Sequence, residues 1–230
     1  MRSRNAIHLD VTDDAGARRT SFQHTDPSLA PDIVEFGIST VLSILERVVA
    51  VAESRGEREP RDHRSLVARV STLIGLAMGQ PTEWVVTLRR AAPLHDLGMI
   101  ATPDALLQKP GELTREEFDV VKRHTTIGAQ ILEGCRSPVL RLAHEVALTH
   151  HERWDGTGYA GLAGEAIPLA GRIVAVADTF DALTHERPYK RASSVGEATL
   201  EIFRGAGTQF DPRVVDAFLS VIEEKELDHS

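Results

Sequence analysis

The chain has 230 residues, a formal net charge of −8 and 42% hydrophobic residues, so it can bury the core of a globular protein. The negative charge argues against binding to a DNA or RNA polymer or to an anionic membrane, because both would be repelled. A small anionic substrate stays compatible if local positive charge meets it. No apolar run suits a signal peptide or a membrane span, and Cys135 is the single cysteine, so we expect a cytoplasmic protein.

The first 30 residues mix charged and small polar side chains, with only a brief apolar alternation at 6–11. A segment of this size and composition cannot bury a core by itself. We therefore expect a flexible N-terminal arm, or a strand that docks on another surface, over residues 1–30.

A long apolar pattern follows, with spacings of three and four residues from Pro31 to Arg55. This periodicity predicts a helix, and we assign residues 31–58 to it. The helix is apolar around more of its circumference than a surface helix needs, so it either packs into the core or pairs with a second copy in a homodimer. Core packing is favoured. The first 55 residues are also where we expect any protein partner to bind.

The rest of the chain, residues 59–230, repeats the helical pattern with short interruptions. The helices expected there, in chain order, cover about 63–78, 81–94, 114–124, 127–132, 138–151, 173–183, 195–203 and 212–224. Thr114 and Glu117 have the spacing of a capping box. Residues 154–161 are expected to form a loop, and so is at least the end of the segment 103–111. The fold class predicted from this pattern is all-α, a helical bundle.

Histidines and aspartates stand at or near the ends of these expected helices. They are His63, His95, Asp96, His124, His150, His151 and Asp178. Taken singly, each is more often a solvated or hydrogen-bonded residue than a metal ligand. Together they indicate a polynuclear metal site at the centre of a bundle, because helix ends can converge there. His150 and His151 diverge by one helical step, which allows them to serve two different ions, and Glu59 shares a helix face with His63 if the helix starts early enough.

An ordered series of short motifs surrounds these residues. It comprises His95–Gly98, Pro103-Asp104, Lys109–Gly111 with Leu113-Thr114, His150–Tyr159, Ile167–Leu169, Asp178–Thr184, Arg187–Lys190 and Phe210–Pro212. With this series the chain resembles an HD-GYP domain, the branch of the HD phosphohydrolase superfamily that hydrolyses cyclic di-GMP. The similarity runs from about Glu59 to Phe218, so residues 59–230 are expected to form a catalytic domain of the HD type.

The resemblance implies a role for each matching residue. The implied metal ligands are Glu59, His63, His95, Asp96, His124, His150, His151 and Asp178, and the implied catalytic residues are Asp96, His95, Arg187 and Lys190. Two or three divalent ions would be bound, a third requiring Glu59, and Asp96 would bridge two of them. Arg187 and Lys190 would lie near the phosphates of the cyclic dinucleotide substrate, and Asp181 would orient a histidine.

The implied chemistry is hydrolysis of cyclic di-GMP to pGpG, and onward to GMP if a third ion is present. Paired cations lower the pKa of a water, supply hydroxide and hold the phosphate oxygens for in-line displacement. Imidazole and carboxylate donors without thiolate favour iron or manganese, and zinc also fits these donors.

Two departures from the family pattern matter. Met99 stands where the family usually has Lys, which removes a cation expected to stabilise the transition state. Ala160 replaces the proline of Gly-Tyr-Pro and is expected to free the loop at one backbone angle. Because the lysine is missing at Met99, the alternative to an active phosphodiesterase is a catalytically weak or inactive signalling protein that binds cyclic di-GMP and acts through a partner. A general nucleotide phosphohydrolase of the HD type is the third alternative.

Overall fold

The computed structural model describes residues 30–55, 63–185 and 192–227. All regular structure within these ranges is helical, and the sole β interaction there is an isolated bridge between Ala206 and Phe210. The all-α prediction is confirmed. No helix in the described part of the chain is both long and apolar enough to span a membrane. The predictions for the 1–29 arm, for Glu59 and for Arg187 and Lys190 lie outside the described residues.

The chain divides into two compact units, Met1–Thr40 and Val41–Ser230. The described part of the first unit is the beginning of helix α1 (Ala30–Ser54), and the rest of that helix belongs to the second unit. The other helices of the second unit are α2 (His63–Ala77), α3 (Thr82–Ala91), η1 (Ala92–Leu94), η2 (Leu97–Ala101), α4 (Asp104–Leu107), α5 (Arg115–Leu132), α6 (Pro138–Thr149), η3 (Gly164–Ala166), α7 (Leu169–Thr184), α8 (Val195–Arg204) and α9 (Pro212–Leu227).

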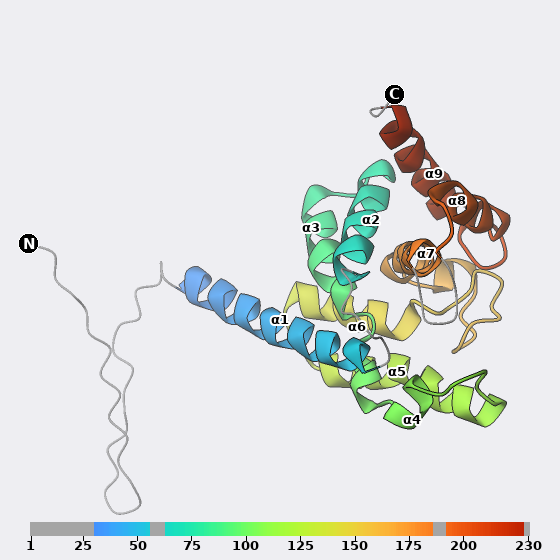
Figure 1. Cartoon of the computed structure of the whole chain (residues 1–230). Coiled ribbons are helices and arrows are strands. Elements are labelled where there is room, and N and C mark those ends of the chain that lie inside the picture. The colour runs from blue at the N-terminus through green and yellow to red at the C-terminus, as the bar shows by residue number, and fades with distance from the viewer. Residues whose placement is uncertain (1–29, 56–62, 186–191, 228–230) are drawn as a thin grey trace, which may run out of the picture. The chain divides into compact units, whose positions relative to one another are not determined.

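Helix α7 is the centre of this second unit (Figure 1). It packs against α2, α6, α8 and α9, and its side chains from Ile173 to Ala177 are all buried. A helix covered on all sides has no polar face, which explains why this run is apolar without amphipathic periodicity. The helix predicted for this segment, in preference to a buried strand, is confirmed.

The part of α1 that belongs to the second unit has two apolar stripes. Leu42, Val49 and Ala52 are buried, whereas Ile44 and Val51 are 55% and 59% exposed. The predicted core packing therefore accounts for one stripe. The exposed stripe explains why the sequence is apolar around so much of the helix.

Two predicted boundaries around the metal-ligand motifs are wrong. Helix α5 runs without a break from Arg115 to Leu132, because Thr125 and Thr126 donate their hydroxyls to carbonyls three residues earlier and stay within the helix. Helix α3 ends at Ala91 rather than at Leu94, because Pro93 has no backbone N–H with which to continue the α-helical ladder.

The loop predicted for at least the end of the segment 103–111 is confirmed at residues 108–111, and the part before it forms a short helix, α4, which follows Pro103 at its N-cap position. The capping box at the start of α5 is confirmed, since the Thr114 hydroxyl accepts from the backbone N–H of Glu117 and the Glu117 carboxylate accepts from that of Thr114. The helices α8 and α9 also lie where they were predicted.

Candidate metal centre

The His95-Asp96 pair lies in a tight turn between two short 3-10 helices, η1 and η2. The turn comes very close to α5, since a Cβ atom at Gly98 would lie 1.9 Å from the backbone oxygen of His124. Glycine is therefore required here for steric reasons. The close approach places the pair beside the imidazole of His124.

The first donor cluster consists of Asp96, His124, His150 and His151. One ligand atom from each lies within 4.8 Å of those of the others. The Nε2 atoms of His124 and His150 are 3.3 Å apart, and they lie 3.2 and 3.6 Å from Asp96 Oδ1. Such spacings suit donors that surround one ion at about 2.0–2.2 Å.

The second donor cluster consists of His63, His95 and Asp178. The Nε2 atoms of the two histidines are 3.4 Å apart, and they lie 3.7 and 3.8 Å from Asp178 Oδ1. Asp96 connects the two clusters, because its Oδ2 atom is 3.6 Å from His95 Nε2 while its Oδ1 atom faces the first cluster. One carboxylate can thus serve two neighbouring ions.

Backbone carbonyls orient three of the imidazoles. The Nδ1 atoms of His95, His124 and His150 lie 2.9, 2.7 and 3.0 Å from the carbonyl oxygens of Ala92, Val121 and Val146. A carbonyl only accepts, so each Nδ1 carries the proton and donates it, which leaves the Nε2 lone pair pointing into the donor cluster. This arrangement is typical of histidines that bind metal.

A carboxylate does the same for the fourth imidazole. Asp181, which is buried, contacts His63 Nδ1 through its Oδ2 atom. Asp181 follows Asp178 by three residues on α7, so one helix supplies both a donor of the second cluster and the group that orients its neighbour.

A second glycine brings α7 against the end of α6. A Cβ atom at Gly171 would lie 2.1 Å from Thr149 Oγ1, so a larger residue would push the two helices apart. Thr149 immediately precedes His150 and His151. The close packing therefore sets the position of the histidines of α6 relative to Asp178 of α7.

Burial favours the neutral form of three of the histidines. It lowers the pKa of His95 and of His124, and it lowers the pKa of His151 to about 3. Burial alone would raise the pKa of Asp96, but the surrounding histidines, His95 first, bring it well below its ordinary value. For His150, burial acts downward while the hydrogen bond and charge of Asp96 prevail and raise its pKa. Neutral imidazole and ionised carboxylate are the forms that bind metal.

Tyr159 covers the first donor cluster from the glycine-rich loop. Its ring lies 4.8 Å from the ring of His151, centroid to centroid. Burial, with the negative charges of Asp96 and Asp178, raises the pKa of Tyr159 to about 12, so its hydroxyl keeps its proton and can donate a hydrogen bond.

The loop around Tyr159 is fixed by a buried carboxylate. Glu152 accepts hydrogen bonds from the backbone N–H groups of Ala160 and Leu162 at 2.7 and 2.8 Å. A proline at position 160 could not donate the first of these bonds. The expected loosening at Ala160 is therefore offset by a hydrogen bond that the family's proline lacks.

A pocket of about 440 Å³ opens beside the two clusters. His150, His151 and Asp178 form its metal-facing wall, and Arg153 and Gln209 contribute polar groups farther out. Its size lies within the range of small-molecule binding sites.

The structure brings together seven of the eight residues predicted to bind metal, and the eighth, Glu59, is outside the described part. His150 and His151, which the sequence allows to serve two ions, both belong to the first cluster. The two residues lie in the turn that ends α6.

Sequence reasoning missed the roles of Glu152, Gln209 and Asp211. Asp211 is buried, pairs with Arg172 of α7 at 2.5 Å and caps the start of α9 through the backbone N–H of Arg213. Glu152 and Asp211 lie inside motifs that were noticed, but a motif match alone does not say which hydrogen bond a carboxylate makes. Gln209 lies just before the last motif and gave no signal.

Comparisons with known proteins identify the family of the chain. The profile of the HD domain family matches residues 42–214. The chain is 47% identical over 188 residues to a cyclic di-GMP phosphodiesterase of Thermotoga maritima, covering 81% of this chain and 50% of the relative. It is 37% identical over 181 residues to the 3'3'-cGAMP-specific phosphodiesterase 2 of Vibrio cholerae, covering 76% of this chain and 34% of the relative. The chain thus spans half or less of the length of these curated relatives.

A solved structure supports the fold. The cyclic GMP-AMP-specific phosphodiesterase V-cGAP3 of Vibrio cholerae superposes with a TM-score of 0.57 at 20% identity, covering 78% of this chain and 48% of that one. At this identity the likeness concerns the fold alone. Since the family profile matches most of the sequence and the helices superpose on such a structure, the chain belongs to the HD domain family.

Proposed function

We propose that this protein is a metal-dependent phosphodiesterase that opens cyclic di-GMP to linear pGpG. The observation that carries the proposal is the pair of donor clusters joined by Asp96, beside a pocket of about 440 Å³. Two divalent ions, iron or manganese, would supply the charge that activates water and stabilises the phosphoryl group. The names of the similar phosphodiesterases support a cyclic dinucleotide as the substrate.

The chain's own groups have separate tasks in this proposal. The four oriented imidazoles keep their Nε2 lone pairs available, and Asp96 holds the two metal positions close together. Tyr159 keeps water away from one side of His151 and offers a hydroxyl proton to a phosphate oxygen. Further phosphate contacts from Arg187 and Lys190, and a third ion on Glu59 that would carry the reaction to GMP, remain predictions.

The exposed stripe of α1 supports a proposal about assembly. Ile44 and Val51 present apolar surface that a second copy or a partner protein would bury. We propose that contacts through the first 55 residues bring the phosphodiesterase to its partner or to a second copy in a homodimer.

The function is tested with metal-analysed protein. Anaerobically reduced protein, loaded with iron or with manganese, is incubated with cyclic di-GMP, and the nucleotides are separated over several hours. We expect pGpG to form in proportion to bound metal and to disappear after chelation. Bound ions with bound but uncut cyclic di-GMP would contradict the proposal and favour the receptor alternative suggested by Met99.

A further inference from the structure

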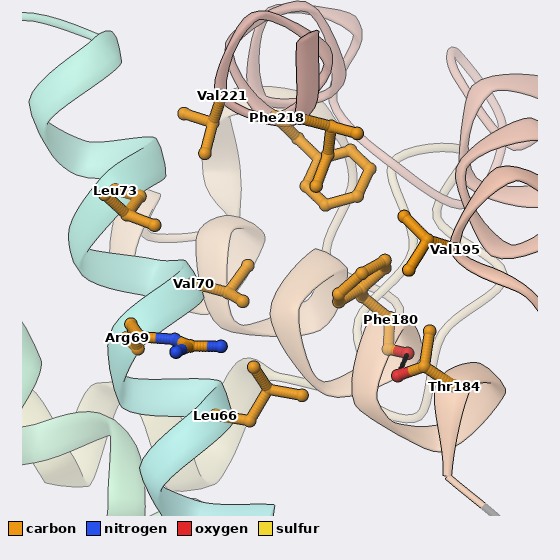
Figure 2. A pocket seen from close by; sticks show the side chains of 10 residues that line it. Leu66, Arg69, Val70, Leu73, Phe180, Thr184, Val195, Phe218 and Val221 are labelled. Atoms are coloured by element: carbon orange, nitrogen blue, oxygen red, sulfur yellow. Dashed lines mark hydrogen bonds between the residues drawn. The ribbon is translucent and has the colours of Figure 1, made fainter. Parts of the chain in front are cut away.

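A second pocket, of about 460 Å³, lies among α2, α7, α8 and α9 (Figure 2). Its floor is formed by Val70, Phe180 and Phe218, all of which are buried. The rings of Phe180 and Phe218 meet edge to face at 5.2 Å. The floor is therefore apolar and held in place by aromatic packing.

The pocket is open to solvent and large enough for a small ligand. A water molecule takes up roughly 30 Å³ of liquid, so a space of about 460 Å³ is much larger than one water molecule. An apolar floor offers no hydrogen bonds that would hold ordered water in such a space. A hydrocarbon chain suits this pocket, because it needs no hydrogen bonds and its transfer out of water lowers the free energy.

One charged side chain lines the pocket. Arg69 shares a face of α2 with Leu66, Val70 and Leu73, and Figure 2 shows its guanidinium between the side chains of Leu66 and Val70. No described residue forms a hydrogen bond or an ion pair with this guanidinium. The second polar group is the Thr184 hydroxyl, and it is already used, since it donates to the carbonyl of Phe180.

Arg69 also borders a neighbouring polar pocket of about 390 Å³, which is lined by Arg64, Arg89 and Glu46. Glu46 offsets part of the positive charge there. Arg69 is the one charged side chain in the described lining of the apolar pocket, so it is the group that favours an anion at the rim.

We propose that the pocket binds an aliphatic carboxylate. Its chain would lie against Phe180 and Phe218, and its carboxylate would accept a charge-assisted, two-pronged hydrogen bond from Arg69. A chain of about ten to fourteen carbons fits, if one methylene occupies about the volume of a water molecule.

The pocket has a direct connection to the metal centre. Leu66 follows His63 by three residues on α2, and Thr184 follows Asp181 by three residues on α7. A bound chain therefore contacts the two helices that hold the second donor cluster and its orienting carboxylate. We expect the acid to change the affinity of the metal-free protein for Mn²⁺.

Binding is tested by calorimetric titration of the full chain with sodium dodecanoate below its micelle concentration. We expect one saturable site per chain. Arg69→Gln should weaken binding at least tenfold, whereas Arg89→Gln, a matched loss of charge outside the apolar pocket, should leave it within twofold. Val195→Trp should abolish binding by filling the rim, and because Val195 is 46% exposed the variant can fold normally.

Four results would overturn the proposal: no saturable binding, equal losses in the two arginine variants, equal affinity for dodecanol, or binding only to anionic phospholipid vesicles. The connection to the metal centre is measured as Mn²⁺ affinity with and without dodecanoate, where we expect at least a threefold change that Val195→Trp removes. An unchanged affinity would overturn the connection. None of these titrations uses a cyclic dinucleotide, so their outcome is independent of the proposed hydrolysis.

Discussion

The metal centre and the apolar pocket share the helices α2 and α7, yet their side chains are chemically opposite. In the metal centre, His63, Asp178 and Asp181 meet in a polar cluster, and four of the five imidazoles of the centre are oriented by an acceptor. In the pocket, residues one turn away are apolar and surround a single cation. One face of a helix can thus serve two unrelated ligands, because successive turns along that face meet different neighbours.

The largest expected effect is a loss of hydrolysis and of bound metal that leaves ligand binding in the apolar pocket unchanged. Asp96→Asn removes the carboxylate charge between the clusters, so we expect hydrolysis to fall at least about a thousandfold and metal content to drop, since Asp96 serves both metal positions. Metal analysis measures the drop in metal content, and the turnover of cyclic di-GMP measures the loss of hydrolysis. Dodecanoate binding should be retained.

The exposed Asp119→Asn on α5 is the matched control for that prediction, and it should keep both properties. Full activity in Asp96→Asn would mean that Asp96 does not connect the metal positions.

A gain of activity is expected next. If the missing family lysine limits phosphate stabilisation, Met99→Lys should raise turnover of cyclic di-GMP by about tenfold, equivalent to about 1.4 kcal/mol. Met99 lies in η2, where its backbone carbonyl accepts from Arg55 at 2.6 Å, and this bond is unaffected by the side chain. Met99→Gln is the uncharged control, and an equal gain there would rule out a charge effect.

A smaller effect is expected on the stability that the loop around Tyr159 contributes. Ala160→Pro restores the family's residue but removes the N–H that donates to the buried Glu152 carboxylate. We expect a loss of about 1.5–3 kcal/mol in the free energy of unfolding, as for other hydrogen bonds to charged groups. Denaturant unfolding measures it. Ala160→Gly, which keeps the backbone N–H, is the control for the change of side chain, and a stabilised Ala160→Pro would show that the bond matters little here.

The smallest effect concerns pH. Because burial lowers the pKa of His151 to about 3, against an ordinary value of about 6.5, the unfolded chain takes up a proton below pH 6.5 that the folded chain excludes. The metal-free protein should therefore lose about 1–2 kcal/mol of stability as the pH falls from 7 to 5, with no contribution from this group above about pH 7. Denaturant titrations at several pH values follow this, and His151→Gln should flatten the dependence.

Local sequence patterns predicted much of this fold. Periodicity and the capping box predicted α5, α7, α8 and α9, because helix formation and capping depend on neighbours in the chain. The breaks at Thr125 and Pro93 were misjudged, since whether a helix continues there depends on hydrogen bonds and packing that periodicity does not reveal. The seven donors were found through their types and their places near helix ends.

What the sequence by itself determined is therefore the helical class, the donor set and the family. Only the tertiary structure decided that Asp96 stands between two clusters, that Glu152 compensates for Ala160, and that Arg69 borders an apolar pocket. Each of these depends on contacts between segments far apart in the chain, such as Gly98 against His124 or Leu66 against Phe180. Spacing along a sequence encodes the face of a helix, whereas the partner that meets that face is fixed only when the helices pack.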